Sequence, residues 1–377
     1  MREYNFTGGM PDPGSFPIEG LIEAAGRALR AAGGDTLVHY PGDLGNITLR
    51  EVAAMRFQAS QGTEISPDDI AITNGSMQAL ELVFRAYVEP GDIVLTEELS
   101  YMGTLGLLRH SKANIVGVPN DEHGMNTDAL EEILRDLAAK GQRPKLINTV
   151  PINHNPTGMN MTAERKRRFI ELAEEYDVVI LEDECYGDIY FEGDPAPSLY
   201  SQAPSGRVIY VATFSKTIGP GVRMGYLSVP QPVMGRIMAN RHDGGPSALA
   251  SLILAEFLRH HMWDHIRKTN GIVREKLATL LAALDENLGD MISCIPPTGG
   301  LFAWTTVPED TDMGRLMAGL DERQVRCTRG QAFHVDQKDI PNVRFSFAYP
   351  SLQDIRDGVE VFADCVRAAQ PSEAAVA

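Results

Sequence analysis

The sequence predicts an α/β fold with a mostly parallel sheet of seven strands, joined to a smaller α+β domain. Seven short β-rich runs lie between residues 70 and 229 with helical patterns between them, and most runs are too apolar for a sheet with one face in water. From about residue 247 to residue 288 the pattern is helical throughout, and strand-like runs return only after residue 299. Strands buried on both faces need helices on both sides, which is the α/β architecture.

The predicted strands of the large sheet follow one another with helices between them. In chain order the strands are Ile70–Thr73, Ile93–Thr96, Ile115–Val118, Leu146–Val150, Val178–Leu181, Val208–Val211 and Tyr226–Val229. Helical periodicity covers Ser76–Val88, Asp128–Ala139 and Thr162–Tyr176. Ahead of these elements, the Gly- and Pro-rich opening at residues 8–14 predicts a loop that leads into a short helix.

The C-terminal part of the chain predicts a separate small domain. The long helical stretch from Ser247 to Leu288 is followed by strand-like runs at Gly299–Trp304, Val325–Thr328 and Val343–Phe347. A final helix is predicted from Leu352 to Ala368. We therefore expect a large domain of residues 41–262, and a small domain that combines residues 1–40 with residues 263–377.

The composition limits what the protein can be. Its 377 residues suffice for two or three domains, and 43% hydrophobic with 23% charged residues is typical of a soluble globular protein. A net charge of −17 argues against nucleic acid as a partner, and the sequence shows neither a signal-peptide pattern nor an apolar run long enough to span a membrane. The four cysteines are far apart and lack metal-ligand spacing. We therefore expect a cytoplasmic protein with reduced thiols and no metal site.

The most informative segment is residues 213–226, which follow a predicted strand. In this segment Lys216 comes after two hydroxyl residues, Thr213 and Ser215, and Arg223 follows it across a Pro-Gly turn. Lysine can form a Schiff base with a carbonyl, while hydroxyl groups and arginine bind phosphate. Pyridoxal 5'-phosphate (PLP) carries both an aldehyde and a phosphate, so it would use all four side chains. The alternative is a plain loop with a solvated lysine and arginine.

Two further places in the sequence could serve the same cofactor. Gly75, Ser76 and Met77 join the first predicted strand to the first helix, where free N–H groups and a hydroxyl could bind phosphate. A plain helix cap is the more common role of such residues. Asp183 follows a strand at the edge where open α/β sheets bind ligands, and its carboxylate could keep the pyridine nitrogen protonated. An aspartate in this position can also simply form a turn.

Four more side chains are candidates for the ring and the substrate. Tyr186 could donate to the ring hydroxyl. Asn155 begins a predicted turn, and its amide could also bond the ring oxygen or a substrate carboxylate. Tyr101 could stack on the ring, or it could be a core aromatic residue. Arg344 lies on an apolar strand, where a charge is unexpected, and it would suit either a substrate carboxylate or a structural Asp or Glu.

Taken together, these motifs resemble those of fold type I PLP-dependent enzymes, specifically the class I/II aminotransferases. The matching segments keep the family's order along nearly the whole chain: Tyr40–Gly45 with Leu49-Arg50, Thr73–Ser76, Asn155–Gly158, Asp183–Tyr186, Ser215-Lys216 with Pro220–Arg223, and Val343–Ser346. The opening at Phe6–Pro13 with Phe16-Pro17 is similar to the subgroup of 2-aminoadipate and kynurenine aminotransferases. The resemblance implies transfer of an amino group from an α-amino acid to a 2-oxo acid through a Schiff base on Lys216.

The resemblance also implies a role for each candidate residue. Lys216 is the Schiff-base lysine and proton shuttle, Asp183 pairs with the pyridinium, and Tyr101 stacks on the ring. Arg344 takes the substrate α-carboxylate, and Gly9 closes over the substrate. The other implied contacts are those of Asn155 and Tyr186 with the ring oxygen, those of Gly75, Ser76, Met77, Thr213, Ser215 and Arg223 with the phosphate, and that of Tyr40 with the phosphate of a neighbouring subunit. The last contact implies a homodimer with shared active sites.

Three departures from the subgroup bear on the substrate. His154 stands where Gln is usual, Leu99 stands where Pro is usual, and we expect the helical extension common before Gly8-Gly9 to be missing. The amino donor and acceptor therefore stay open, and His154 is as well explained by a structural role as by a catalytic one. Two other functions share this fold: a PLP-dependent lyase or cyclase acting at the β or γ carbon, and the ligand-sensing domain of a transcription regulator. The acidic charge and the short segment before Gly9 disfavour the regulator.

Overall fold

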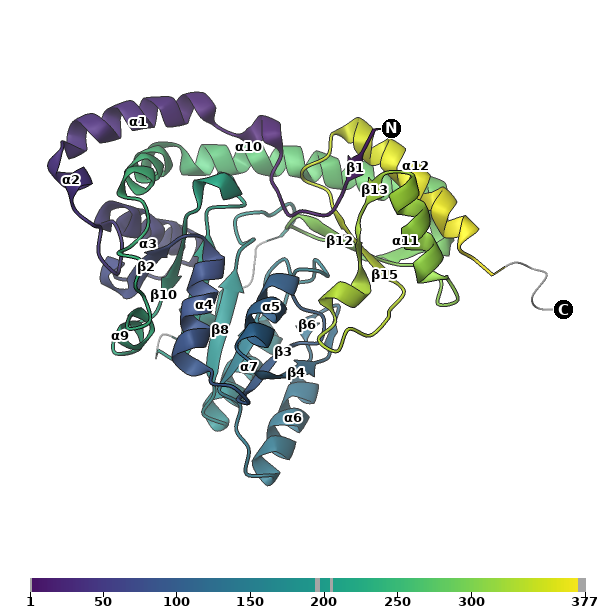
Figure 1. The fold of residues 1–377 in the computed structure, drawn as a ribbon, viewed down its shortest axis with the longest axis horizontal. Coiled ribbons are helices and arrows are strands. Elements are labelled where there is room, and N and C mark those ends of the chain that lie inside the picture. Colours follow the sequence, from purple (N-terminus) through teal and green to yellow (C-terminus); the bar gives the residue numbers. More distant parts are fainter. Residues whose placement is uncertain (1, 194–196, 204–205, 372–377) are drawn as a thin grey trace.

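The computed structural model describes residues 2–193, 197–203 and 206–371. Its centre is a seven-stranded sheet in the order β2-β10-β9-β8-β7-β3-β4 (Figure 1). The strands are β2 (Ile70–Thr73), β3 (Ile93–Glu97), β4 (Asn114–Val118), β7 (Leu146–Thr149), β8 (Val179–Glu184), β9 (Val208–Thr213) and β10 (Gly225–Ser228). β10 runs antiparallel to both neighbours, and the other adjacent strands are parallel. The seven predicted strands and the mostly parallel sheet are confirmed.

Helices cover both faces of this sheet, because successive strand residues point to opposite sides. On one face Leu181 and Val211 belong to a core with α4 (Ser76–Tyr87), α5 (Met102–His110) and α9 (Val233–Met238). On the other face Ile180 and Tyr210 belong to a core shared with several more helices: α3 (Ile47–Gln61), α6 (Thr127–Ala139), α7 (Ala163–Glu175) and α8 (Leu199–Gln202). The three helices predicted between strands are therefore present as α4, α6 and α7. A short hairpin of β5 (Asn120–Asp121) and β6 (Gly124–Met125) precedes α6.

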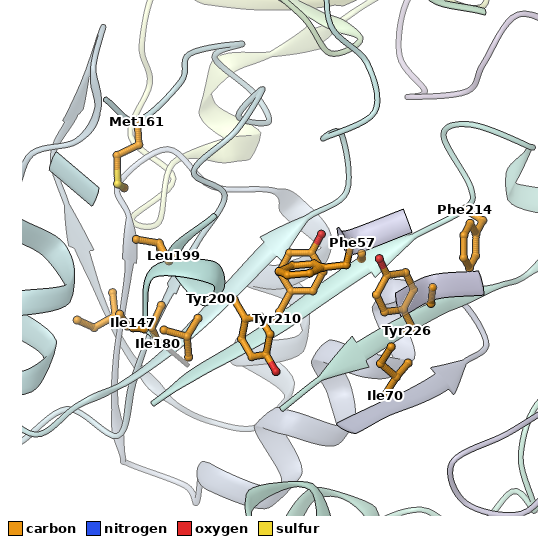
Figure 2. Close-up of a cluster of buried hydrophobic side chains, with 14 of the residues drawn as sticks. Phe57, Ile70, Ile147, Met161, Ile180, Leu199, Tyr200, Tyr210, Phe214 and Tyr226 are labelled. Atoms are coloured by element: carbon orange, nitrogen blue, oxygen red, sulfur yellow. The ribbon is translucent and has the colours of Figure 1, made fainter. Parts of the chain in front are cut away.

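An aromatic row runs through the second of these cores towards the end of β9 (Figure 2). The ring of Phe57 lies edge-on to Tyr210, with centroids 5.1 Å apart. Tyr226 continues the row, 6.1 Å from Tyr210 and 5.6 Å from Phe214. All four rings are buried. Since Phe214 stands two residues before Lys216, this packing fixes the backbone that carries the lysine.

A second, smaller sheet has the order β11-β12-β15-β14, with β11 (Ser293–Cys294), β12 (Phe302–Thr306), β14 (Thr328–Arg329) and β15 (Asn342–Ser346). It shares a core with α11 (Met313–Glu322) and α12 (Leu352–Ala368), and α12 is the predicted final helix. The single strand expected at residues 325–328 is wrong. β13 (Val325–Arg326) pairs with β1 (Tyr4–Asn5) in a separate ribbon, and only β14 joins the small sheet. The sequence pattern also missed β11, which has only two residues.

The helical stretch expected after residue 247 is one helix, α10 (Ala248–Leu288), which runs along both parts of the molecule (Figure 1). Its residues up to Ile266 belong to the core of the large sheet, and those from Val273 onward to the core of the small sheet. Near the N-terminus, α1 (Ile18–Ala32) places Ala24 in the core of the large sheet, whereas Phe6 lies in the core of the small sheet. With 15 residues, α1 is longer than the short helix expected there. None of the helices in the described ranges combines the length and the apolar composition of a membrane span.

Candidate active site

A cavity of about 220 Å³ lies at the edge of the large sheet where the parallel strands β2, β7, β8 and β9 end. This is where ligands bind in open α/β sheets. Apart from Tyr40, every predicted cofactor contact lines it: Gly75, Ser76, Met77, Tyr101, Asn155, Asp183, Tyr186, Thr213, Ser215, Lys216 and Arg223. Val150, Cys185 and Pro220 complete the lining, and no role is predicted for them from sequence.

Lys216 follows β9 and reaches into this cavity. Its Nζ donates to the backbone oxygen of Gly9 at 2.8 Å, and burial lowers the pKa of its ammonium group. The lowered pKa increases the fraction of neutral amine, which is the nucleophilic form. The next residue is clamped from two elements: the Thr217 hydroxyl donates to Asp188 Oδ2 at 2.9 Å, and the Thr217 carbonyl accepts from His265 Nε2 at 2.8 Å. The lysine therefore extends from a rigid backbone.

The turn between β2 and α4 forms an anion cradle in the cavity wall. Gly75 has a φ of 80°, and α4 begins at Ser76 without a side-chain cap. A Cβ on Gly75 would lie 2.8 Å from Arg223 Nη2, so the guanidinium packs directly on the turn, and the positive φ favours glycine at this position. The hydroxyl groups of Thr213 and Ser215 are bonded to each other at 2.9 Å in the same lining. Helix N–H groups, hydroxyl groups and an arginine together suit a phosphate.

Asp183 lies in the same cavity near the end of β8. Its side chain is buried, and burial raises the pKa of the carboxyl group to about 6. The Cys185 thiol donates to Asp183 Oδ1 at 2.8 Å. A carboxylate with so little solvation favours a positively charged partner, such as a protonated ring nitrogen. Beside it, Tyr186 and Asn155 meet through an Asn155 Nδ2 to Tyr186 Oη bond of 3.2 Å.

Arg344 lies next to the cavity on β15, with a guanidinium that no carboxylate in the described ranges neutralises. It is 3% exposed and lies between two aromatic rings, 4.3 Å from the Phe302 centroid and 4.6 Å from the Phe333 centroid. Its Nη1 donates to Asn155 Oδ1 at 2.7 Å, and Nη2 donates to the backbone oxygen of Thr7. Burial lowers its pKa to about 10, so it stays charged at neutral pH. The structural Asp or Glu partner considered from sequence is therefore not found among the described residues.

The structure brings Gly9 to the site but leaves Tyr40 outside it. Gly9 contacts Lys216 through its carbonyl, and a Cβ on Gly9 would lie 2.7 Å from Phe302 Cζ, so a larger residue would collide with the ring. Tyr40 is 86% exposed and lies beside Gly244, in a separate depression of the surface. Within one subunit Tyr40 therefore has no access to the cavity of its own chain.

Several residues around the site were missed or left open by sequence reasoning. Phe302 and Phe333 are apolar residues of short elements, and no local signal marks them as neighbours of an arginine. Cys185 stood out only as a reduced thiol. His154 is buried and does not line the cavity: its Nδ1 is bonded to the Thr157 hydroxyl at 2.8 Å, and burial lowers its pKa to about 3. A neutral, buried histidine beside the Asn155 turn favours the structural role.

Comparison with known proteins gives a consistent family assignment. Residues 7–362 match the family model described as aminotransferase class I and II. The aromatic-amino-acid aminotransferase 1 of Thermococcus litoralis is 31% identical over 367 residues, which cover 96% of this chain and 88% of that protein. The 2-aminoadipate transaminase of Thermus thermophilus is 30% identical over 360 residues, which cover 94% of this chain and 88% of that protein.

Solved structures give the same assignment. The kynurenine aminotransferase of Pyrococcus horikoshii, solved in complex with PMP, superposes with a TM-score of 0.93 at 28% identity, covering 99% of this chain and 92% of that chain. The α-aminoadipate aminotransferase LysN of Thermus thermophilus, solved with N-(5'-phosphopyridoxyl)-L-leucine, superposes with a TM-score of 0.90 at 28% identity, covering 97% and 92%. The fold type I architecture expected from the sequence is thus confirmed.

The cavity also fits the cofactor of this family. The cradle formed by Gly75 and Arg223, which a Cβ would fill, suits a phosphate, and the buried carboxylate of Asp183 suits a pyridinium. Lys216 supplies an amine of lowered pKa in the same space. The chain belongs to the class I and II aminotransferases, with pyridoxal phosphate as its cofactor.

Proposed function

We propose that this aminotransferase takes α-amino acids as donors and 2-oxo acids as acceptors, and that Arg344 holds the α-carboxylate of both. The observation that carries the proposal is the buried Arg344 guanidinium, which has no carboxylate partner in the described ranges and is joined by Asn155 to Tyr186. A buried charge without a counter-ion is costly, so the site gains when an anionic ligand arrives. Every α-amino acid and every 2-oxo acid carries such a carboxylate at the reacting carbon.

We assign the cofactor contacts as follows. Lys216 would be the amine that attaches to the cofactor, and Asp183 would face the ring nitrogen. The ring oxygen would lie at Asn155 and Tyr186, the ring face at Tyr101, and the phosphate at Gly75, Ser76, Met77, Thr213, Ser215 and Arg223. When bound, PLP supplies an aldehyde carbon that accepts the amino group and a ring that draws electrons from the substrate Cα.

The chain's own contribution to the reaction would be proton transfer and orientation. Lys216 Nζ would take a proton from the substrate Cα and later give a proton up again. Its lowered pKa suits both steps, because the amine must be neutral to act as a base near neutral pH. Asn155 would lie between the substrate and the cofactor. Its Oδ1 accepts from Arg344, the proposed contact of the substrate carboxylate, and its Nδ2 donates to Tyr186, the proposed contact of the ring oxygen.

The N-terminal segment would close the substrate side of the site. Three successive carbonyl groups of this segment contact active-site residues: Thr7 with Arg344, Gly8 with the Ser346 hydroxyl, and Gly9 with Lys216. A bound substrate carboxylate would take the place of the Thr7 carbonyl on Arg344, because a carboxylate is the stronger acceptor. Gly9 would then lie over the substrate.

We further propose a homodimer with shared active sites and a cytoplasmic location. Apolar side chains are exposed along α1 and α2 (Asp35–Val38), among them Ile18 at 58%, Ile22 at 59% and Val38 at 72%. Monomers rarely leave such apolar surface uncovered, and Tyr40 beside it would reach the partner's phosphate. The four free cysteines support a reducing compartment. The division into residues 41–262 on one side and residues 1–40 with 263–377 on the other stays a proposal. The two cores that part along α10 between Ile266 and Val273 support its C-terminal boundary, whereas Ala24 of α1 lies in the core of the large sheet.

The test is to add one amino acid at a time to the PLP-loaded enzyme, without any 2-oxo acid. A transaminating donor should convert one cofactor per site to the amine form and yield one equivalent of 2-oxo acid. Addition of 2-oxoglutarate or pyruvate should then restore the starting absorbance. Continued release of ammonia or of a cyclised product without an acceptor would instead identify a lyase or cyclase. The relatives from Thermococcus litoralis and Thermus thermophilus, which are named an aminotransferase and a transaminase, do not favour that alternative.

A further inference from the structure

One side chain in the cavity joins two groups that sequence reasoning treated separately. Cys185 follows β8, and its Sγ lies 2.8 Å from Asp183 Oδ1 and 3.2 Å from Ser76 Oγ. Ser76 opens α4 in the anion cradle, and Asp183 is the carboxylate proposed for the ring nitrogen. The thiol therefore lies between the phosphate contact and the ring-nitrogen contact.

Counting protons fixes the direction of both hydrogen bonds. A thiol carries one proton, and an ionised carboxylate can only accept. Cys185 Sγ must therefore donate to Asp183, and the Ser76 hydroxyl must donate to Sγ. Burial, followed by the charge of Asp183, raises the pKa of the thiol well above its ordinary value, so the proton stays on sulfur at neutral pH.

The carboxylate depends on this thiol for its orientation. Within the described ranges, the bond from Cys185 is the only hydrogen bond that Asp183 accepts from a side chain. The bond engages Oδ1, and no hydrogen bond to Oδ2 is found within the described ranges, so Oδ2 would be free to accept from a ring nitrogen. The same bond favours the ionised carboxylate and opposes the rise in its pKa that burial causes.

We propose that Cys185 is a positioning residue for PLP: its thiol holds Asp183 ionised and turned towards the ring nitrogen, and Ser76 holds the thiol until phosphate binds. The proposal rests on the assignment of Asp183 to the ring nitrogen. When a phosphate accepts from the Ser76 hydroxyl, the Cys185 thiol loses its hydrogen bond with Ser76 and keeps the one to Asp183. Binding at the two ends of the cofactor is thereby linked through one thiol.

The competing explanation is packing, because a cysteine can act as a small apolar side chain without directing any proton. Cys185→Ser keeps a donor of nearly the same size, whereas Cys185→Ala removes it. If the thiol directs Asp183, the alanine variant should bind PLP about five- to tenfold more weakly, which is the effect of losing one hydrogen bond to a charged group from a weak donor. The serine variant should stay within about twofold of the parent. Cys327→Ala, which removes a buried thiol from the small-domain core, is the matched control and should leave the affinity unchanged.

The experiment titrates the cofactor-free proteins with PLP and with pyridoxal, which lacks the phosphate, and follows the absorbance of the lysine-bound cofactor. The loss in Cys185→Ala should appear with both ligands, because the thiol acts on the ring-nitrogen carboxylate. A loss seen only with PLP would place the action at the phosphate and overturn the proposal. So would equal loss in the alanine and serine variants, which would mean packing. Failure of the unmodified protein to take up PLP would instead refute the proposed cofactor contacts.

A second measurement needs no stable Cys185 variant. Removing the negative acceptor should lower the pKa of the thiol. In the cofactor-free protein, Asp183→Asn should therefore lower the pH at which Cys185 reaches half of its maximal rate of alkylation by iodoacetamide. Peptide mass spectrometry would separate Cys185 from the other three cysteines. An unchanged midpoint would show that the thiol and the carboxylate are not coupled, and the proposal would fail.

Discussion

Replacing Arg344 with lysine tests how the substrate is held. The change keeps a basic residue at this position. It removes the planar guanidinium group that donates to Asn155 and stacks between Phe302 and Phe333. A lysine ammonium in this buried place would also have a lowered pKa, because desolvation disfavours the charged form. The variant therefore loses a charged hydrogen-bond donor where a carboxylate is expected to bind.

The expected loss follows from these contacts. A hydrogen bond to a charged group contributes about 1.5–3 kcal/mol, and a cation–π contact contributes about 0.5–1 kcal/mol towards holding the guanidinium in place. A total of about 2–4 kcal/mol corresponds to a fall in kcat/KM of roughly 30- to 1000-fold. Most of the loss should appear in KM, since the carboxylate is bound in the ground state and the transition state alike.

The assay measures kcat and KM for an aliphatic, an aromatic and a dicarboxylic amino acid, with PLP absorbance as a check on the cofactor. The fall should be similar for all three donors, because all share the α-carboxylate. Arg329→Lys on the adjacent strand β14, where Arg329 pairs with Asp339 at the surface, is the control and should change kcat/KM by less than about twofold. A loss confined to dicarboxylic donors would show that Arg344 reads a side chain, and the reasoning would be refuted.

Four further predictions concern the cofactor, the assembly and pH. Borohydride should fix PLP to the peptide that contains Lys216, and Lys216→Ala should lose roughly 10³-fold or more in turnover; fixation at another lysine excludes the assignment. Asp183→Asn should retain PLP but slow turnover by roughly 10²–10³-fold, and near-normal turnover would place the pyridinium partner elsewhere. Mixing Tyr40→Phe subunits with Lys216→Ala subunits should give heterodimers in which one site is free of both changes and has the parent's activity, whereas a fully active monomer in sedimentation would exclude shared sites. Burial raises the pKa of the Glu97 carboxyl group in β3 from 4.5 to about 7. Between these pH values the folded protein keeps a proton on Glu97 that the unfolded chain releases, so the free energy of unfolding falls as the pH rises from 4.5 to about 7. Glu97→Gln cannot titrate, and its Tm should decline less than that of the parent between pH 5 and pH 7; parallel declines would contradict the shift.

The sequence by itself determined the large sheet and much of the cofactor cavity. Runs such as Ile70–Thr73 and Val208–Val211 are apolar enough to require burial on both faces, and that requirement sets the α/β class without any knowledge of contacts. Because parallel strands end at one edge, residues that follow different strands, such as Gly75, Asp183 and Lys216, were expected to meet, and they line one cavity.

Only the tertiary structure decided which partners these residues have. Arg344 was marked by its charge on an apolar strand, but its position between Phe302 and Phe333 and its bond to Thr7 have no local signature. The same holds for β13, whose pairing with β1 split a strand predicted as one, and for the thiol of Cys185 between Asp183 and Ser76. Local periodicity reports how each segment is buried, whereas these contacts join segments far apart in the chain. Their existence depends on how the packed cores place the ends of the elements in space.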